Sequence, residues 1–251
     1  MSDRTWSSRA LVLSLSTFGE GHRDAKLLTE DRGIVQAAVF GGAKSKLKGL
    51  VNPWHTGTVW IYSDPVKNHH KITDFDVSEW RQGIRESLAR TFAASVCTEI
   101  VTRSHGVADW TIVNAFLDGI AVSSDDECRR ALNRFLWRIL HSAGIAPDLS
   151  CCSRCGRGMS GENGESTVSY YSPHEEAVLC ADCARPEERS VPLSIEARSW
   201  LLAVERLPPS RSRAWKCEPR EETEIRRFLR FLVSRHFGGE LKTLNAAEGI
   251  L

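Results

Sequence analysis

The chain has 251 residues, and its 33 Lys and Arg nearly balance its 32 Asp and Glu, giving a formal net charge of +1 at pH 7. This balance excludes nucleic-acid binding through bulk positive charge and leaves only local basic patches for that purpose. The N-terminus lacks the apolar run of a signal peptide, and no stretch approaches the roughly 20 apolar residues of a membrane helix. We therefore expect a soluble, cytoplasmic protein without a membrane partner.

The first third of the chain is rich in short apolar runs with turn residues between them. These runs read as strands and cover residues 10–16, 25–29, 34–40, 57–62 and 70–75. Gly33 precedes the third run, and the turn-forming segment SDPVKN separates the last two. Five short strands within about seventy residues favour a small closed or nearly closed barrel.

From residue 78 onward the apolar period changes to that of helices. Trp80, Ile84, Leu88, Phe92, Val96 and Ile100 recur every four residues, which predicts one face of a helix. A second, largely buried helix is predicted over 108–122. A third should begin at a capping box of Ser124 and Glu127, continue with apolar residues between 128 and 140, and end at Gly144.

Helical periodicity returns near the C-terminus, at 194–207 and at 220–237. The last of these helices should bury one apolar face, formed by Ile225, Phe228, Leu229, Leu232 and Val233. Neither the earlier nor the later helices make much of a core alone, so we expect them to pack together as one bundle.

Five of the eight cysteines cluster between residues 151 and 183. Cys152-x-x-Cys155 and Cys180-x-x-Cys183 are two knuckles, each of which directs two thiolates at one point. Two such turns complete a tetrahedron around Zn²⁺, and a closed shell of four thiolates makes the zinc structural, not catalytic. Cys151 could in principle replace Cys152 in the first pair, and this alternative stays open. The isolated Cys97, Cys128 and Cys217 are expected to be small core residues.

A second metal pattern competes with this interpretation. His174-x-Glu176 before Cys180-x-x-Cys183 resembles the signature of zinc deaminases, but only residues 177–179 intervene and a second knuckle competes for the metal. The chain also lacks the glycine-rich phosphate loop, the G-x-S-x-G turn and the H-E-x-x-H zinc motif. We therefore do not expect an enzyme or any catalytic residue.

Three basic segments are candidates for binding anions. Lys44, Lys46 and Lys48 lie in the glycine-bounded loop 41–49, which either follows phosphates or is a solvated surface loop. Arg211, Arg213 and Lys216 surround Trp215 in a proline-rich connection. Cationic residues beside an exposed aromatic suit single-stranded nucleic acid. We expect the arginines to take this binding role and Trp215 to fold down onto the helices. The helix over 124–144 carries a basic face that either is solvated or receives an acidic peptide, formed by Arg129, Arg130, Arg134 and Arg138.

Several segments together resemble the RecO family of bacterial recombination mediators. The opening strands over 10–46, with Gly19-Glu20 in the first turn and a basic stretch after the third strand, are similar to the start of that family. So are the segment RFLWRILHSAGIAPDLSCCSRCG at 134–156 and the segment SYYSPHEEAVLCADC at 169–183. The C-terminal GGELKTLNAAEGIL at 238–251 completes a likeness that extends over nearly the whole chain.

The resemblance implies an α+β protein with an N-terminal five-stranded OB-fold at 1–78. A helical bundle domain would follow at 79–150 and 186–251, with a four-cysteine zinc-binding insert at 151–185. It also implies a DNA repair mediator that binds and anneals single- and double-stranded DNA. With RecR, such a protein helps load RecA on strands coated by the single-strand-binding protein SSB. The arginines at 129, 130 and 134 would take the acidic C-terminal tail of SSB, and the protein would associate with the nucleoid.

Two other functions are compatible with the sequence. One is a zinc-ribbon adaptor whose barrel and helices contact only proteins. The other is a zinc-dependent nucleic-acid enzyme, which would need an open coordination position on its metal.

Overall fold

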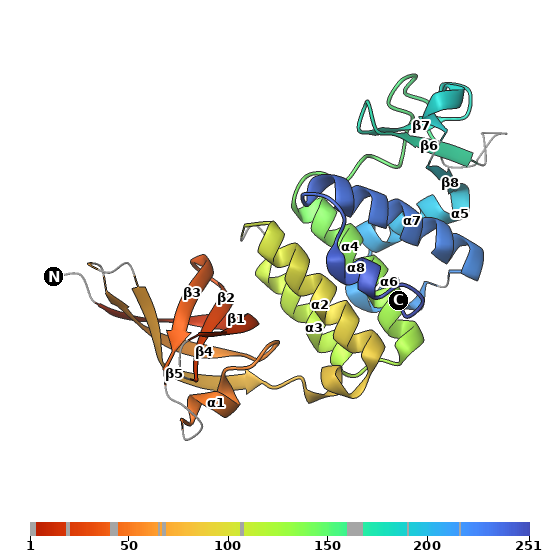
Figure 1. Ribbon diagram of the computed structural model, residues 1–251. Coiled ribbons are helices and arrows are strands. Elements are labelled where there is room, and N and C mark those ends of the chain that lie inside the picture. Colours follow the sequence, from red (N-terminus) through yellow and green to blue (C-terminus); the bar gives the residue numbers. More distant parts are fainter. Residues whose placement is uncertain are drawn as a thin grey trace. The chain divides into compact units, whose positions relative to one another are not determined.

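The architecture is described from a computed structural model (Figure 1), which covers residues 4–18, 21–40, 45–64, 66, 69–105, 108–159, 168–189, 191–215 and 217–251. The chain forms two compact units. Unit 1 comprises Met1–Cys128 and Leu241–Leu251, and unit 2 comprises Arg129–Glu240. The division into three domains expected from the sequence stays a prediction.

The five predicted strands are present and close into a barrel. They are β1 (Thr5–Phe18), β2 (His22–Thr29), β3 (Gly33–Val39), β4 (Thr56–Asp64) and β5 (His69–Glu79), in the order β1-β2-β3-β5-β4. Neighbouring strands are antiparallel except β3 and β5, which pair in parallel at the closure. The register shifts within β1 between Val12 and Ser14, and bulges of this kind let a strand bend around a barrel.

The barrel interior is filled by small and branched apolar residues that alternate along the strands. Alanines at 10, 25 and 37 lie beside larger side chains such as Leu27, Ile61 and Phe75. At Gly57, an added Cβ would meet the Asp76 carbonyl oxygen at 2.0 Å, so glycine permits the close approach of β4 and β5.

A short helix packs against β5 of the barrel. We expected a loop here, but residues Leu47–Leu50 form the helix α1. The Leu47 side chain is buried in the barrel core and holds this segment in place. The Arg23 guanidinium on β2 donates to the carbonyls of Leu47 at 3.1 Å and Val51 at 3.2 Å. Burial lowers the pKa of Arg23 from its ordinary value.

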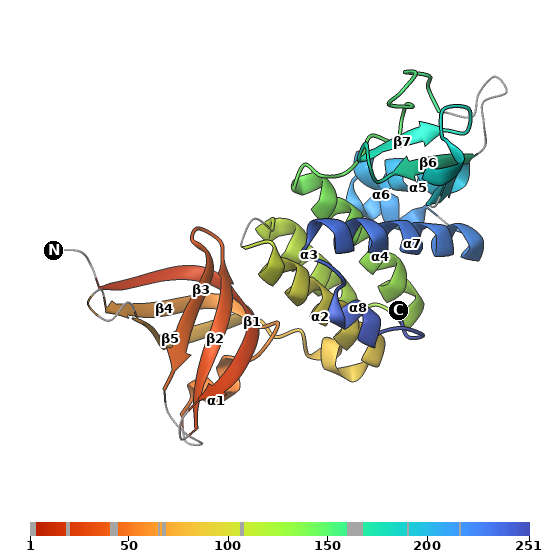
Figure 2. The ribbon, with the colours of Figure 1, turned by 45° about the horizontal axis from the view of Figure 1, so that its top comes forward.

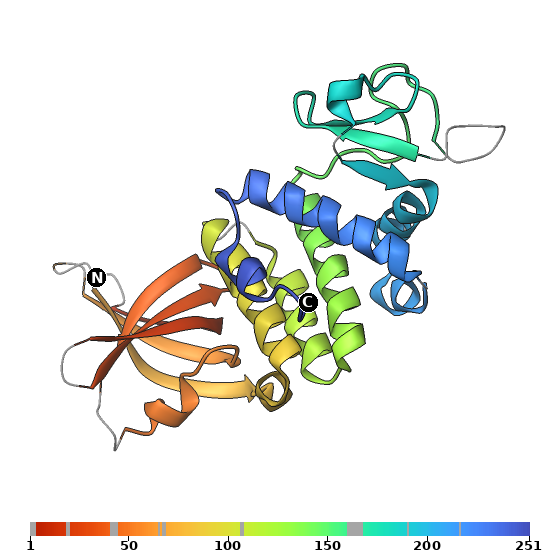
Figure 3. The ribbon, with the colours of Figure 1, turned by 45° about the vertical axis from the view of Figure 1, so that its right-hand side comes forward.

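The helices of unit 1 are η1 (Gln82–Glu86), α2 (Leu88–Arg103), α3 (Trp110–Ala121) and α8 (Lys242–Ala246). Figure 3 shows α2 and α3 side by side, and α2 contacts both α3 and α8. The predicted start of the first helix near residue 78 is wrong. Strand β5 continues to Glu79, and α2 begins only after Ser87, whose hydroxyl accepts from the Arg90 N–H. Consequently Trp80 and Leu88 are exposed, although Ile84, Val96 and Ile100 are buried as expected.

Arg81 joins the barrel to the helices of unit 1. Its backbone is left-handed, with φ 46°, and its side chain is 2 % exposed. The guanidinium donates to Asp118 Oδ1 at 2.6 Å and to Asn114 Oδ1 at 2.9 Å, both on α3. It also donates to the Trp54 carbonyl and to Thr56 Oγ1, each at 2.8 Å, on the barrel side. One side chain therefore holds four groups from two parts of the unit.

Glu99 on α2 holds the C-terminal segment against the same helices. Its carboxylate accepts from the backbone N–H groups of Lys242 at 3.1 Å and Thr243 at 2.9 Å, and from the Thr243 hydroxyl at 2.6 Å. Partial burial raises the pKa of Glu99, but these hydrogen bonds outweigh that effect and the pKa lies below its ordinary value. The Glu99 carboxylate therefore takes the place of an N-cap side chain for α8, although Glu99 lies in a distant part of the sequence.

Unit 2 is built from helices and a small sheet. Its helices are α4 (Asp125–Ser142, within the unit from Arg129), η2 (Pro186–Glu188), α5 (Ile195–Arg206), α6 (Pro209–Ala214) and α7 (Pro219–His236). The sheet has the order β7-β6-β8, with β6 (Val168–Ser172), β7 (Ala177–Cys180) and β8 (Pro192–Ser194). The hairpin of β6 and β7 was predicted, whereas β8 was not. Strand β8 contacts both α5 and α7.

The predicted helices of unit 2 are confirmed. The Ser124 hydroxyl accepts from the Glu127 N–H at the start of α4, and Gly144 after its end has φ +70°. The five residues predicted as the apolar face of α7 are all buried. Helix α4 before the cysteine segment packs with α7 after it, since the Trp137 and Phe228 rings lie 6.2 Å apart. The described part of the chain contains no helix that could span a lipid bilayer.

Replacing Arg81 with Met should lower the free energy of unfolding by about 2–4 kcal/mol, because the oxygens around the buried guanidinium lose their donor. Asp118→Asn is the matched control. The Asp118 side chain is 51 % exposed, and water can replace its ion pair. We expect this variant to cost less than about 1 kcal/mol. Urea unfolding of the two variants measures the difference, and equal costs would show that the joint does not depend on Arg81.

Candidate metal centre and nucleic-acid interface

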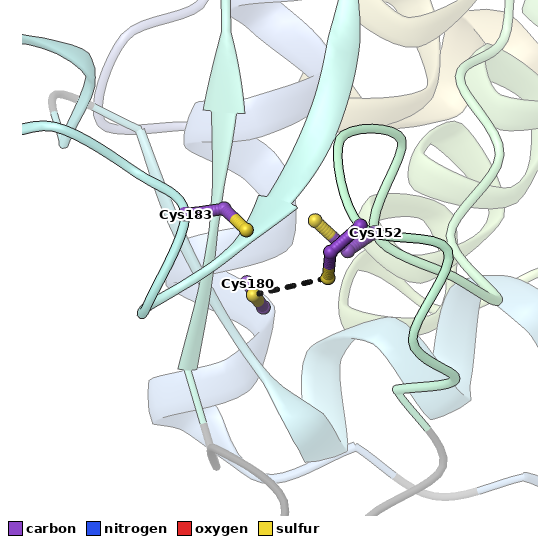
Figure 4. A group of neighbouring side chains, drawn as sticks. Cys152, Cys180 and Cys183 are labelled. Atoms are coloured by element: carbon purple, nitrogen blue, oxygen red, sulfur yellow. Dashed lines mark hydrogen bonds between the residues drawn. The ribbon is translucent and has the colours of Figure 1, made fainter.

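The structure brings the four cysteines of the two predicted knuckles together in unit 2. The sulfur atoms of Cys152, Cys155, Cys180 and Cys183 all lie within 4.8 Å of one another. The Sγ atoms of Cys155 and Cys180 are 3.9 Å apart. Figure 4 shows the sulfurs of Cys152, Cys180 and Cys183 converging from a loop and from the end of the hairpin. The group can hold one metal ion.

The donor set and its spacing fit a tetrahedral thiolate site. A metal–sulfur distance of about 2.3 Å places the sulfurs of a tetrahedron about 3.8 Å apart, close to the 3.9 Å between the sulfurs of Cys155 and Cys180. Four thiolates suit soft or borderline ions and fill the coordination shell, so no position remains for a substrate.

Local backbone geometry shapes both knuckles. The Gly156 N–H donates to the Cys152 carbonyl at 2.8 Å, and Gly156 takes φ +70°, which glycine adopts without strain. In the second knuckle the Ala184 N–H donates to the Cys180 carbonyl at 3.0 Å. A hydrogen bond of 3.1 Å from the Ser153 N–H to the Val178 carbonyl ties the first knuckle to β7. The folded chain therefore sets the knuckles face to face.

The thiols of the cluster differ in proton affinity. Burial raises the pKa of Cys152, but nearby backbone hydrogen bonds outweigh it and lower this pKa to about 6. Hydrogen bonds with the side chains of Cys180 and Cys155 raise the pKa of Cys183 to about 12. A metal ion must displace the remaining protons as it binds.

Arg154, within the first knuckle, stabilises the lobe that carries the cysteines, whose described residues are 151–159 and 168–189. Its guanidinium donates to the Cys183 carbonyl at 2.5 Å, to Glu188 Oε1 at 2.8 Å and to the Glu175 carboxylate. The hydrogen bond with Arg154 lowers the pKa of Glu188 to about 2. Sequence reasoning missed this clamp: an arginine between two cysteines is visible in the sequence, but its partners become neighbours only in the fold.

The other candidate ligands point elsewhere. The Cys151 thiol donates to Asp148 Oδ2 at 3.4 Å, and Cys151 is not part of the cluster. That hydrogen bond raises the pKa of Cys151. His174 is exposed, and Glu176 accepts from Arg235 Nη2 on α7 at 2.9 Å. Cys97 and Cys128 are buried as predicted, and Cys217 is half-buried.

The lysines of the predicted phosphate-binding loop are only partly described. Lys44 lies outside the described residues. The exposed Lys46 ammonium contacts the Asp74 carboxylate, with Nζ 3.0 Å from Oδ1. Lys48 on α1 is exposed. An exposed ion pair like that of Lys46 is weak, so a phosphate group can compete for the ammonium.

The predicted connection around Trp215 contains helix α6. Arg211 and Arg213 on this helix are exposed, whereas Lys216 lies outside the described residues. Trp215 is 48 % exposed. The expectation that Trp215 folds down onto the helices is therefore wrong.

The basic face of α4 is not a simple solvated face. Arg129 and Arg130 are half-buried, but Arg134 is only 4 % exposed. Arg138 donates to Ser212 Oγ on α6 at 2.9 Å. Burial, then the nearby Arg134 and Arg213, lowers the pKa of Arg138. Positive charge is thus concentrated where α4 and α6 meet.

Comparisons with known proteins fit this architecture. The family described as Recombination protein O N terminal matches residues 1–81, and Recombination protein O C terminal matches residues 110–245. A DNA repair protein RecO from Anaeromyxobacter sp. (strain K) is 27 % identical over 239 residues, which are 92 % of this chain and 91 % of the relative. RecO of Desulforamulus reducens is 24 % identical over 93 % of this chain and 90 % of its own length. RecO of Bacillus pumilus is 23 % identical over 94 % and 91 %. The chain therefore belongs to the RecO family of DNA repair proteins.

Proposed function

We propose that this protein is a non-enzymatic recombination mediator that binds single- and double-stranded DNA and anneals complementary strands. With RecR, it would help RecA load on strands coated by SSB. Family membership supports this proposal. The observation that carries it is the closed five-stranded barrel of unit 1, because small barrels of this kind bind oligonucleotides on their outer strands and loops.

Local positive charge gives the barrel a way to hold the DNA backbone despite the nearly neutral chain. Lys46 and Lys48 are exposed at the start of α1, which contacts β5. In this proposal they and Lys44 bind phosphates, and Arg211, Arg213 and Lys216 form a second contact in unit 2. Neutralising phosphates on both strands lowers the repulsion that opposes annealing.

The acidic tail of SSB is the partner that we propose for α4. Arg129 and Arg130 would make the direct contacts, since Arg134 is almost fully buried and contributes its charge from below the surface. A carboxylate-rich peptide suits such a site, because guanidinium groups bind carboxylates in a bidentate manner.

The metal of the four-cysteine site is proposed to be zinc with a structural role. Its lobe has few apolar residues, and a closed tetrathiolate site supplies folding free energy to such a segment. The barrel, the helical domain and the zinc insert would form three domains of a cytoplasmic, nucleoid-associated protein.

Replacing Lys46 and Lys48 with Ala should weaken DNA binding and flatten its salt dependence. Each phosphate contact that is lost should reduce the slope of log K against log [salt] by about 0.7 to 0.9. Fluorescence anisotropy with a labelled oligonucleotide at several salt concentrations measures the slope. Adding Lys44→Ala should flatten it further, whereas Lys242→Ala on α8 should leave it unchanged. An unchanged slope would remove the loop from the site, and no binding at low salt would favour the adaptor function.

Cys152→Ser and Cys155→Ser should each abolish retention of zinc, and Cys151→Ser should retain about one zinc per chain. Metal analysis of the purified variants measures this content, and X-ray absorption should show four sulfur ligands in the unmodified protein. If Cys151→Ser lost its zinc and Cys152→Ser kept it, Cys151 would be the ligand in place of Cys152. Fewer than four sulfur ligands would support a catalytic metal.

Replacing Arg129 and Arg130 together with Ala should weaken binding of an acidic peptide by roughly 10-fold or more, the range for losing a charged hydrogen bond. Arg220→Ala is the control, because its side chain is 86 % exposed on α7 of the same unit. Anisotropy of a labelled SSB tail peptide reports the affinity. Equal affinities in both variants would place the tail elsewhere.

A further inference from the structure

The outer face of the barrel carries a groove that the sequence did not indicate. A cavity of about 590 Å³ lies along β3 and is bordered by the end of β1, by β2 and by the start of β5. Figure 2 shows β1, β2 and β3 side by side in this part of the barrel. The residues used below that line the cavity are Ser16, Phe18, Asp24, Gln36 and His69. Its volume falls in the range of small-molecule and cofactor sites.

An aromatic cluster of Phe18, His22, Phe40 and His69 lies at one end of the groove. The Phe18 ring lies 5.7 Å from His22 and 6.3 Å from Phe40, and the Phe40 ring lies 6.0 Å from His69. His22 also contacts Phe40, with ring centroids 5.0 Å apart. Phe18 is therefore in contact with neighbouring rings, although the residue is 41 % exposed.

Polar groups border the same space. The side-chain amide of Gln36 donates to the Asp24 carboxylate on the neighbouring strand, and both residues line the groove beside Ser16. The exposed Lys71 ammonium lies 5.3 Å from the centre of the Phe40 ring. The groove thus combines an aromatic face, hydrogen-bonding side chains and a cation at its border.

A purely structural role does not account for the exposed ring. The barrel core is complete without Phe18, because it consists of interior residues such as Val12, Val39 and Ile72. A residue that merely capped the barrel would be expected to bury its ring over that core. Phe18 instead directs much of its surface into an open cavity.

We propose that this groove binds an unpaired base of single-stranded nucleic acid, an inference that rests on the proposed DNA binding of the barrel. The base stacks on Phe18, and its polar edge meets Asp24 and Gln36. Lys71 contacts a neighbouring phosphate. Stacking on an aromatic side chain accepts any base, because every base has a π-face. A paired base inside a duplex cannot enter, so the groove distinguishes single strands from duplexes.

The test compares Phe18→Ala with Trp60→Ala, which removes a 36 % exposed aromatic side chain from β4 of the same barrel, outside the groove. Anisotropy at low salt gives the affinity of each variant for a labelled oligo(dT). The same measurement is made for an abasic oligomer of equal length and for a duplex. Phe18→Ala should weaken oligo(dT) binding by roughly 5- to 100-fold. Its affinity for the abasic oligomer and the duplex should stay unchanged.

Two further measurements make the result decisive. Phe18→Tyr keeps a ring and should retain the affinity for oligo(dT). A fluorescent 2-aminopurine within the oligomer should be quenched by the unmodified protein and by Trp60→Ala, but much less by Phe18→Ala. Equal effects of Phe18→Ala on normal and abasic oligomers would overturn the base site while leaving DNA binding intact. If the unmodified protein bound none of these oligomers, the proposed function would fail together with the groove.

Discussion

The buried guanidinium of Arg81 fixes the barrel to the helices of unit 1, and the direction in which the barrel presents its surface depends on it. A flexible tether would let the barrel rotate against α2 and α3. Arg81 prevents this by donating to a carbonyl and a hydroxyl on one side and to two α3 side chains on the other. A planar guanidinium with several fixed donors suits such a junction, which a lysine with one ammonium could not replace. Trp54 strengthens the joint through its indole N–H, which donates to Thr98 on α2 at 3.2 Å.

The lobe with the four cysteines follows a different physical principle. The barrel has a large apolar core of its own, whereas the lobe contacts α7 through Tyr171, whose ring lies 5.8 Å from Phe228 and 5.7 Å from Phe231, and through the Glu176–Arg235 pair. The knuckles beyond this anchor are held by backbone hydrogen bonds and by Arg154. Because the pKa of Glu188 is lowered to about 2, its pairing with Arg154 contributes stability at all pH values above its ordinary pKa. That contribution declines progressively as the pH falls from the ordinary pKa to about 2, and the carboxylate stays ionised beside Arg154 down to that pH, well below the pH at which free thiolates are protonated. Acid should therefore release a bound metal before it opens the clamp.

Features with a local cause were predictable from the sequence. The strand runs, the apolar face of α7 and the two knuckles each depend on residues close together in the chain, so spacing alone revealed them. The segment 78–87 was mistaken because Trp80 and Leu88 fit a helical period, although the left-handed Arg81 interrupts it to reach its partners on α3. The solvated alternative for the basic face of α4 fails for a similar reason. Arg138 fits a solvated face by period, but α6, much later in the chain, covers it through Ser212. No local pattern could reveal such contacts.

The groove could not be predicted from the sequence for the same reason. Its lining residues come from four strands, and no local sequence motif links them. Its location bears on how a nearly neutral chain could promote annealing. Tight binding through many cations would hold two strands but would also resist their rearrangement, and tight binding of many bases would hide the edges that must pair. A few lysines together with one groove that takes a single unpaired base would avoid both problems. The backbone would be held by contacts that salt weakens, and most bases of the strand would stay free to find their complements.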